Sequence, residues 1–256
     1  MNLFPSNVKL LSTPRFLDGG SSQGNFENLN LALHVNDEQS SVLNNRALIV
    51  SHYNLPSSPV WVNQIHSNIS VDADSIETIV DADASYSKKI GTVCGILTAD
   101  CLPVFVCNKD GTFVGIAHAG WRGLVDGIIE SLIESFKCNG EDLVVHLGPA
   151  ISQSSFQVGR EVKSQYLSKN KNFKNCFTYL NNKYYLDLYG AAKVVLKSFG
   201  VRSISGGDSC THKELDKYFS YRRDGKCSGR MAHLIWIESL NKEKEGRVDR
   251  SSRSRP

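Results

Sequence analysis

The stretch TVCGILTADCLPVFVCNKDGTFVGIAHAGWRGLVDGIIESLIESF, residues 92–136, decides the fold class because short apolar runs are followed by one long periodic segment. Three runs, at residues 92–98, 102–107 and 113–118, have the length and the Val, Ile, Leu and Phe content of buried strands. Polar residues 108–111 end in glycine and are typical of a turn. The stretch therefore predicts three strands, of which the last two are joined by a turn.

An amphipathic helix is predicted after these strands. Leu124, Ile128, Leu132 and Phe136 recur at every fourth position, which places their side chains on one face of a helix. Trp121 stands at the start of this pattern. We therefore expect a single long helix with one broad apolar stripe.

Strands and helices continue to alternate on either side of this stretch. The pattern predicts strands at residues 60–66, 142–147, 201–204 and 231–238, and a helix at residues 187–199 that Gly200 closes. Because hairpins and helices interleave, the pattern favours an α/β fold with a mixed sheet over a purely parallel one. No repeat or linker divides the chain, so we expect one domain over residues 1–245.

The composition is that of an ordinary folded domain, with 41% apolar and 21% charged residues. The net charge of +3 comes from residues 246–256, which hold four Arg and one Asp; the rest has 25 basic and 25 acidic residues. We expect this tail to be disordered or a remnant of cloning. The neutral body does not indicate a nucleic-acid partner. Without a signal-peptide pattern or a membrane-spanning run, the seven scattered Cys predict reduced thiols in a cytoplasmic protein.

One cysteine and two histidines are the strongest candidates for chemistry. His66, Cys101 and His118 stand where predicted strands end or bend, and such positions can present side chains to a common site. A thiolate and two imidazoles suit a borderline-soft ion such as zinc, and three protein ligands leave one coordination position open, as in catalytic zinc sites. The same residues could instead supply a cysteine nucleophile and a histidine base. The residues alone leave both possibilities open.

Several multi-residue motifs follow one another along the chain. They are a pattern over residues 13–46, NQIH at 63–66, TADCLPV at 98–104, AHAGWRGL at 117–124, GPAI at 148–151 with residues 156–162, and FSYRRD at 219–224 with Gly229-Arg230. Together they resemble the YfiH family, whose members are described as multicopper polyphenol oxidoreductases (laccase-like) and as purine nucleoside phosphorylases.

The resemblance implies a zinc site at His66, Cys101 and His118, with copper as the other metal, and catalytic use of the same three residues. It implies phosphorolysis of adenosine, inosine or methylthioadenosine, with adenosine deamination as a further activity. The partners implied are therefore a small-molecule nucleoside and phosphate. The fold implied is an α/β sandwich related to Cys-His hydrolases.

Three other functions stay open. A laccase-like oxidase needs several coppers, and seven His in the whole chain are too few for a trinuclear centre. A metal-free hydrolase would use Cys101 as nucleophile and His118 as base. A binding or scaffold protein would keep the site only to hold the fold. The oligomeric state and the preferred nucleoside are also left open.

Residues near the motifs allow two interpretations each. Arg122 and the start of its helix could attract an anion such as phosphate, or the guanidinium could be solvated. Arg222 and Arg223 could hold phosphate together or form an exposed charged turn. Asp100 could orient a ligand or cap a turn. His34 is expected to serve in packing, outside the site.

Overall fold

The three apolar runs of residues 92–118 become strands of two different sheets in the computed structural model, which describes residues 3–239. They are β5 (Cys94–Thr98), β6 (Leu102–Asn108) and β7 (Val114–Ala119). β5 belongs to a four-stranded sheet, whereas β6 and β7 form an antiparallel pair inside a six-stranded sheet. Residues 99–101 cross from one sheet to the other, so Cys101 lies at this crossing.

The two larger sheets mix parallel and antiparallel strands, as the sequence predicts. The four-stranded sheet has the order β1 (Val8–Ser12), β13 (Met231–Ile237), β5 and β2 (Val60–Trp61), with only β2 and β5 parallel. The six-stranded sheet has the order β12 (Ser203–Gly206), β8 (Leu143–Leu147), β6, β7, β4 (Ala84–Ser87) and β3 (Ser70–Asp72), with a parallel pair at each edge. A small antiparallel sheet contains β10 (Phe177–Leu180), β11 (Lys183–Leu186) and β9 (Gln157–Val158).

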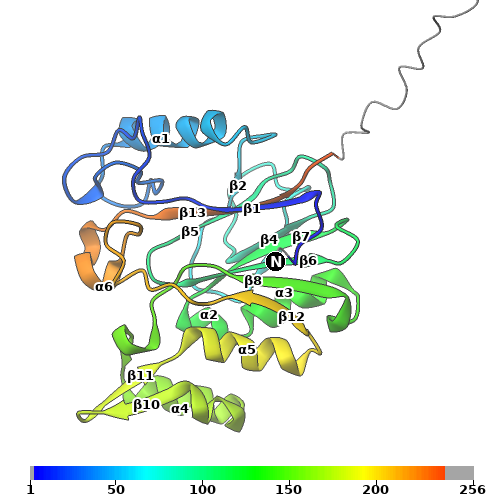
Figure 1. Cartoon of the computed structure of the whole chain (residues 1–256), viewed down its shortest axis with the longest axis vertical. Helices are drawn as coiled ribbons and strands as arrows, with labels where there is room; N and C mark the ends of the chain where they lie inside the picture. Colours follow the sequence, from blue (N-terminus) through cyan, green and yellow to red (C-terminus); the bar gives the residue numbers. More distant parts are fainter. Residues whose placement is uncertain (1–2, 240–256) are drawn as a thin grey trace, which may run out of the picture.

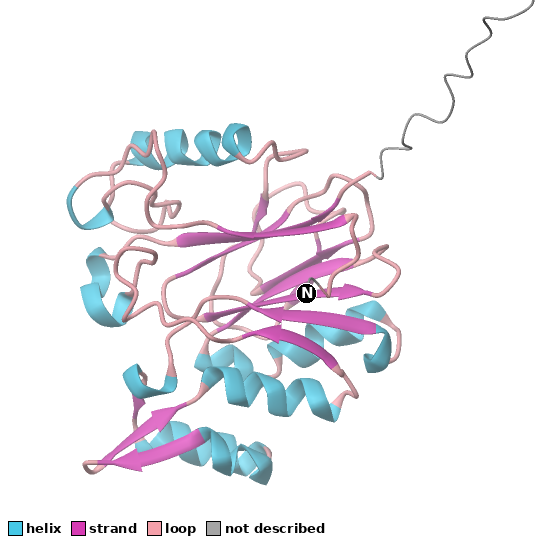
Figure 2. Ribbon diagram, in the orientation of Figure 1, coloured by secondary structure: helices cyan, strands magenta, loops and turns pink. Residues whose placement is uncertain are grey.

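Helices cover the outer faces of the two larger sheets (Figures 1 and 2). α1 (Gln39–His52) packs on the four-stranded sheet, and α2 (Trp121–Asp126), α3 (Ile128–Phe136) and α5 (Leu188–Ser198) pack on the six-stranded sheet. The small sheet and α4 (Arg160–Lys169) lie at one end, and α6 (Tyr221–Asp224) lies in the segment between β12 and β13.

The hydrophobic core follows the alternation of side chains along each strand. Ile96 of β5 meets Phe105 and Ile116 of the facing sheet in a common core. Because successive strand residues point to opposite faces, Val104 and Val106 pack on the helices instead. The arrangement is therefore an α/β sandwich with two facing sheets between helices.

The segment after β7 corrects the prediction of a single helix. It forms α2 and α3, which meet at Gly127, whose φ of 100° and ψ of 33° are left-handed. A left-handed residue interrupts an α-helix. The apolar stripe nevertheless stays together, since Leu124, Ile128 and Phe136 all lie in one buried cluster. The spacing of the apolar residues predicts the buried face correctly but not the break.

Two predicted strands are also shorter or shifted. Of residues 60–66 only Val60–Trp61 form a strand, and the strand predicted at 201–204 is Ser203–Gly206. Beyond β2 the side chain of Gln64 replaces backbone pairing: its Oε1 accepts a hydrogen bond from Leu97 N at 2.7 Å, and its Nε2 donates to Leu97 O at 2.8 Å. The loop thus stays attached to β5 without being a strand.

Part of the predicted domain, residues 240–245, and the tail at 246–256 lie outside the described residues, so the domain boundary stays a prediction. Within residues 3–239, no helix has both the length and the apolar character needed to cross a membrane.

We predict that Gly127→Ala destabilises the protein, because a side chain at a left-handed residue costs about 1–2 kcal/mol. The new Cβ would meet its nearest neighbour, Glu130 Cδ, at 3.7 Å, so the cost comes from the backbone and not from a clash. Urea denaturation should show a free energy of unfolding lower by about 1 kcal/mol or more. Glu134→Ala, at an exposed position of α3, is the control and should change it by less than about 0.5 kcal/mol. Equal stability of Gly127→Ala and the unsubstituted protein would contradict this explanation.

Candidate metal centre

Three side chains that the sequence singles out lie together in the structure. One donor atom from each of His66, Cys101 and His118 lies within 4.8 Å of the other two, and Cys101 Sγ is 3.9 Å from His66 Nε2. The two imidazole rings have centroids 4.8 Å apart and planes inclined at 71°. Ligand atoms around a tetrahedral zinc ion lie about 3.3–3.8 Å apart. Small side-chain adjustments would therefore let the three donors share one ion.

Each of the three residues occupies a strand end or a bend. His118 is near the end of β7 and only 4% exposed. Cys101 follows Asp100, whose φ of 91° turns the chain between β5 and β6. His66 has a φ of 61° and lies in an exposed loop past β2, which corrects the prediction that it closes a strand.

A fully buried carboxylate, Asp83, holds both histidines. Its Oδ1 accepts hydrogen bonds from His118 Nδ1 at 2.7 Å and from the backbone N of His66 at 3.1 Å. Its Oδ2 accepts from the backbone amides of Ile65 and Ser67 and from the Ser67 hydroxyl. Because Asp83 occupies Nδ1 of His118, the other ring nitrogen is left for Cys101 or a metal ion. Asp83 stands in none of the motifs that the sequence interpretation used, and its role was missed.

The electrostatics of the cluster favour ionised groups. Burial opposes the charge on Asp83, but hydrogen bonds from His118 and Ser67 and the charge of His118 lower its pKa to about 2. Burial also opposes ionisation of Cys101, yet the two neighbouring imidazoles, His118 foremost, lower the pKa of its thiol. Burial disfavours the charged imidazole of His118, but Cys101 and Asp83 raise its pKa. A thiolate is the form of cysteine that binds metals or attacks as a nucleophile.

The glycine between His118 and Trp121 is required by close packing. A Cβ added at Gly120 would lie 2.8 Å from His66 Cδ2 and 3.0 Å from Cys101 Sγ. Since both distances are shorter than ordinary contacts of a Cβ, a larger residue would displace two members of the cluster. The segment AHAGW therefore contains one candidate ligand and a glycine that leaves room for the other two.

Asp100 has hydrogen-bond partners outside the cluster. Its Oδ1 accepts from the Thr211 hydroxyl and its Oδ2 from the backbone N of Arg222, each at 2.6 Å. Its backbone O accepts from Ile151 N. Asp100 therefore fastens the bend that carries Cys101 to two distant segments.

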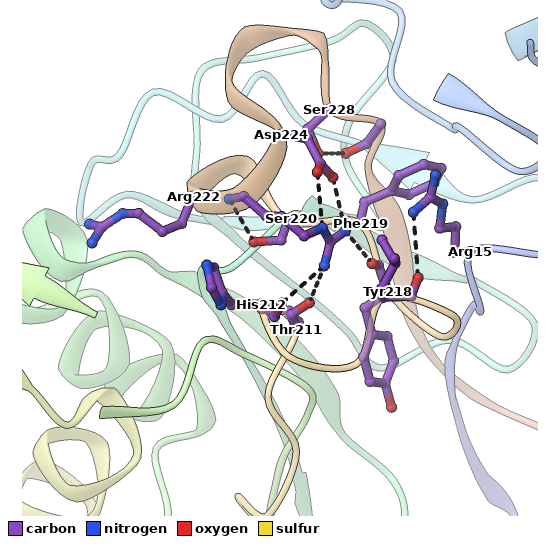
Figure 3. Close-up of polar contacts among 12 residues, drawn as sticks. Arg15, Thr211, His212, Tyr218, Phe219, Ser220, Arg222, Asp224 and Ser228 are labelled. Carbon is purple, nitrogen blue, oxygen red and sulfur yellow. Dashed lines mark hydrogen bonds and ion pairs between the residues drawn. The ribbon is translucent and has the colours of Figure 1, made fainter. Parts of the chain in front are cut away.

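The two arginines of the C-terminal motif have different surroundings, so their interpretation as a paired phosphate clamp is wrong. The guanidinium of Arg223 donates to the carboxylate of Asp224 and to backbone oxygens of Thr211, His212 and Tyr218. Figure 3 shows these partners gathered around one guanidinium while Arg222 extends away from them. Arg222 instead donates to the backbone O of Gln157 at 3.0 Å and lies over the ring of Phe156.

A cavity of about 510 Å³ adjoins the cluster. Its lining includes five apolar or aromatic side chains: Leu97, Trp121, Ile151, Phe156 and Leu188. It also includes four basic side chains, His34, Arg122, Arg222 and Arg230, two of which lie over aromatic rings of the lining. The position of His34 corrects the expectation that it serves only in packing.

The guanidinium of Arg122 is exposed and lies 4.4 Å from the centroid of the Trp121 ring. Arg230 and Phe156 were not singled out from the sequence, and only their place in longer motifs could have indicated them.

We predict that Asp83→Asn destabilises the protein by about 3 kcal/mol, since it removes one partner of a buried, hydrogen-bonded pair. The pKa of Asp83 falls from its ordinary value of 3.8 in an unfolded chain to about 2 in the fold. Its contribution should therefore be complete above about pH 4 and should disappear as the pH falls through about 2. Urea denaturation at several pH values, with a chelator present, measures this. Asp81→Asn is the control, because the carboxylate of Asp81 accepts an exposed hydrogen bond from Asn63. If both substitutions have the same effect at neutral pH, Asp83 does not hold the cluster.

Comparisons with known proteins agree on one family. The family model described as multi-copper polyphenol oxidoreductase laccase matches residues 12–238. The protein named purine nucleoside phosphorylase YfiH of Escherichia coli strain K12 is 42% identical over 235 residues, which cover 91% of this chain and 95% of that protein. A purine nucleoside phosphorylase of Pseudomonas aeruginosa is 38% identical over 236 residues, with 91% and 95% covered.

Solved structures agree with this result. A crystal structure of a Neisseria meningitidis protein is 41% identical and superposes with a TM-score of 0.88, covering 93% of this chain and 98% of that one. The crystal structure of YlmD from Geobacillus stearothermophilus is 26% identical, with a TM-score of 0.82 and coverages of 91% and 93%. Because the family model spans nearly all of the described chain and close relatives align over most of their length, the chain belongs to the YfiH family.

Proposed function

We propose that this protein is a purine nucleoside phosphorylase with zinc at His66, Cys101 and His118. The observation that carries the proposal is the position of the three donors at a cavity lined by both apolar or aromatic and basic side chains. A volume of about 510 Å³ lies within the range of small-molecule sites. The relatives named purine nucleoside phosphorylase support the same activity. Adenosine, inosine and methylthioadenosine are the proposed nucleosides.

The donor set fits zinc better than it fits a multicopper centre. Among residues 3–239, His66, Cys101 and His118 form the one group of His, Cys and carboxylate side chains close enough to share an ion. Two other histidines form hydrogen bonds within the fold. His233 is buried and bonds to Ser12 and Thr98, and His146 bonds to Ser205. One copper could occupy the three-residue group, but oxidation of phenols by oxygen normally uses several coppers.

Residues of the chain have separate tasks in the proposed reaction. The aromatic side chains of the cavity, Trp121 and Phe156, would stack on the purine and exclude water. The basic side chains would hold phosphate, whose oxygen attacks C1′ of the ribose while the bond from C1′ to the purine nitrogen breaks. Asp83 fixes the ring of His118 and the loop of His66, so that both imidazoles are held before substrate arrives. When bound, zinc would act as a Lewis acid and stabilise negative charge at its open position.

Two alternatives use the same side chains. Adenosine deamination would use water in place of phosphate at the same centre. A metal-free hydrolase would use the thiolate of Cys101 as nucleophile and His118 as base. Phosphate dependence and metal content separate these functions.

We predict about one zinc ion per chain in protein purified without chelators or affinity metals. Cys101→Ala should lose most of this zinc, because a thiolate ligand is removed and two imidazoles bind zinc weakly. Elemental analysis by mass spectrometry measures the content. Cys138→Ser is the control, since Cys138 is an exposed free thiol, and it should keep the zinc. Full zinc in Cys101→Ala would show that the ligand assignment is wrong, and copper in its place would favour the oxidase.

We also predict that adenine release from adenosine requires inorganic phosphate and yields ribose 1-phosphate. Chromatography of reactions with and without phosphate measures adenine, hypoxanthine and inosine. Inosine formed equally without phosphate would identify deamination instead. No purine product in either reaction would contradict the proposed phosphorylase and leave the hydrolase and scaffold alternatives.

A further inference from the structure

The lining of the cavity has more positive than negative side chains. Three arginines, Arg122, Arg222 and Arg230, line it together with a single carboxylate, Asp100. Both oxygens of that carboxylate already accept strong hydrogen bonds. The positive charge also affects His34. Burial lowers the pKa of His34, and the charge of Arg230 lowers it further. The cavity therefore has an unbalanced positive region beside the metal centre, which suits an anion.

Two of the three arginines are exposed, and each lies over an aromatic ring. The exposed guanidinium of Arg122 stacks over Trp121. Arg222 is also exposed, and it donates to the backbone O of Ser155 and of Gln157 across Phe156. Both are thus placed where water screens their charge.

Arg230 is the partly buried arginine of this cavity, and its guanidinium also lies over the ring of Tyr221, 5.7 Å from the centroid. Its backbone is fixed, because its N donates to Asn30 Oδ1 at 3.0 Å and its O accepts from Leu31 N. Its Nη1 donates to the backbone O of Ser228 at 2.6 Å and of Gly229 at 3.0 Å. No acceptor among the described residues takes a hydrogen bond from Nε or Nη2, and no described carboxylate lies within ion-pair distance. One edge of a positioned guanidinium is therefore left with donors for a ligand.

The charge of Arg230 also lacks a full counter-charge. Burial lowers its pKa, and the negative groups that oppose this effect most are Cys101 and then Asp100. The thiolate of Cys101 would be neutralised by a bound metal ion, and Asp100 is engaged by Thr211 and Arg222. A partly buried cation without a carboxylate partner is costly unless an anion joins it.

We propose that Arg230 is the phosphate-binding residue of this cavity, with Nε and Nη2 donating to two oxygens of one phosphate. This inference rests on the proposed phosphorylase function. It assigns the anion to the partly buried Arg230, whereas the sequence suggested Arg122. Guanidinium and phosphate match in a two-point geometry that a lysine ammonium does not reproduce. The site lies in the same cavity as the three metal-centre side chains, so phosphate held there shares the cavity with the nucleoside.

The test is a calorimetric titration of inorganic phosphate into the zinc-containing protein as purified. Arg230→Gln should weaken phosphate binding about tenfold to a hundredfold, the effect of losing a charged hydrogen-bond donor pair. Arg230→Lys should bind with intermediate affinity, because it keeps the charge but loses the fork. Arg202→Gln is the matched control, since Arg202 pairs with Glu141 in an exposed ion pair elsewhere on the surface. In turnover assays, Arg230→Gln should raise the KM for phosphate far more than the KM for the nucleoside.

The outcomes are distinct. If folded Arg230→Gln and Arg230→Lys both bind phosphate as tightly as the unsubstituted protein, the inference is overturned while phosphorolysis stands. A larger loss in Arg122→Ala than in Arg230→Gln also overturns it and identifies Arg122 as the anchor. If Arg230→Gln does not fold, as judged by its thermal melt, Arg230→Lys decides, and a phosphate affinity at least fivefold weaker in that variant supports the inference. A failure of the proposed function looks different: the unsubstituted protein itself would neither bind phosphate nor need it for purine release.

Discussion

The buried carboxylate of Asp83 is the interaction on which the geometry of the metal centre depends. It accepts hydrogen bonds from the ring of His118 and from three consecutive backbone amides, those of residues 65–67. A loop that contains the left-handed residue His66 and the strand residue His118 are thereby held by the same carboxylate. A fully buried charge is tolerated only when such partners surround it. The same network that stabilises the charge therefore orients two of the three donors.

The third donor is positioned by the crossing between the two sheets. Residues 99–101 leave the four-stranded sheet and enter the six-stranded sheet, and Asp100 ties this crossing to the C-terminal motif. Arg223 in turn organises that motif by donating to backbone oxygens and to Asp224. Asp100 and Arg223, which the sequence offers as candidates near the site, thus stabilise the surrounding structure. Arg230, by contrast, lines the cavity and keeps donors that have no acceptor among the described residues.

Much of the fold follows from local sequence patterns. β5, β6, β7, β8, α5 and β13 are close to the predicted segments, because apolar runs and four-residue spacings depend on burial, which local sequence records. α1 and α4 were not predicted, since α1 buries few apolar residues and α4 only Val162 and Tyr166. The break at Gly127 was also missed, because the apolar spacing is the same on both sides of it.

By itself the sequence determined the α/β class, the core strands and the residue types for a three-ligand centre, and its motifs indicated the family. Only the tertiary structure decided that Asp83 orients His118, that His66 lies in a loop, and that Arg223 is structural while Arg230 has free donors. These facts depend on contacts between segments far apart in the chain, such as Asp83 with His118 and Asp100 with Thr211. The sequence shows that a residue is charged, but it does not show whether the side chain faces solvent, a buried partner or a cavity. The partners that distinguish these cases exist only after the two sheets have packed together.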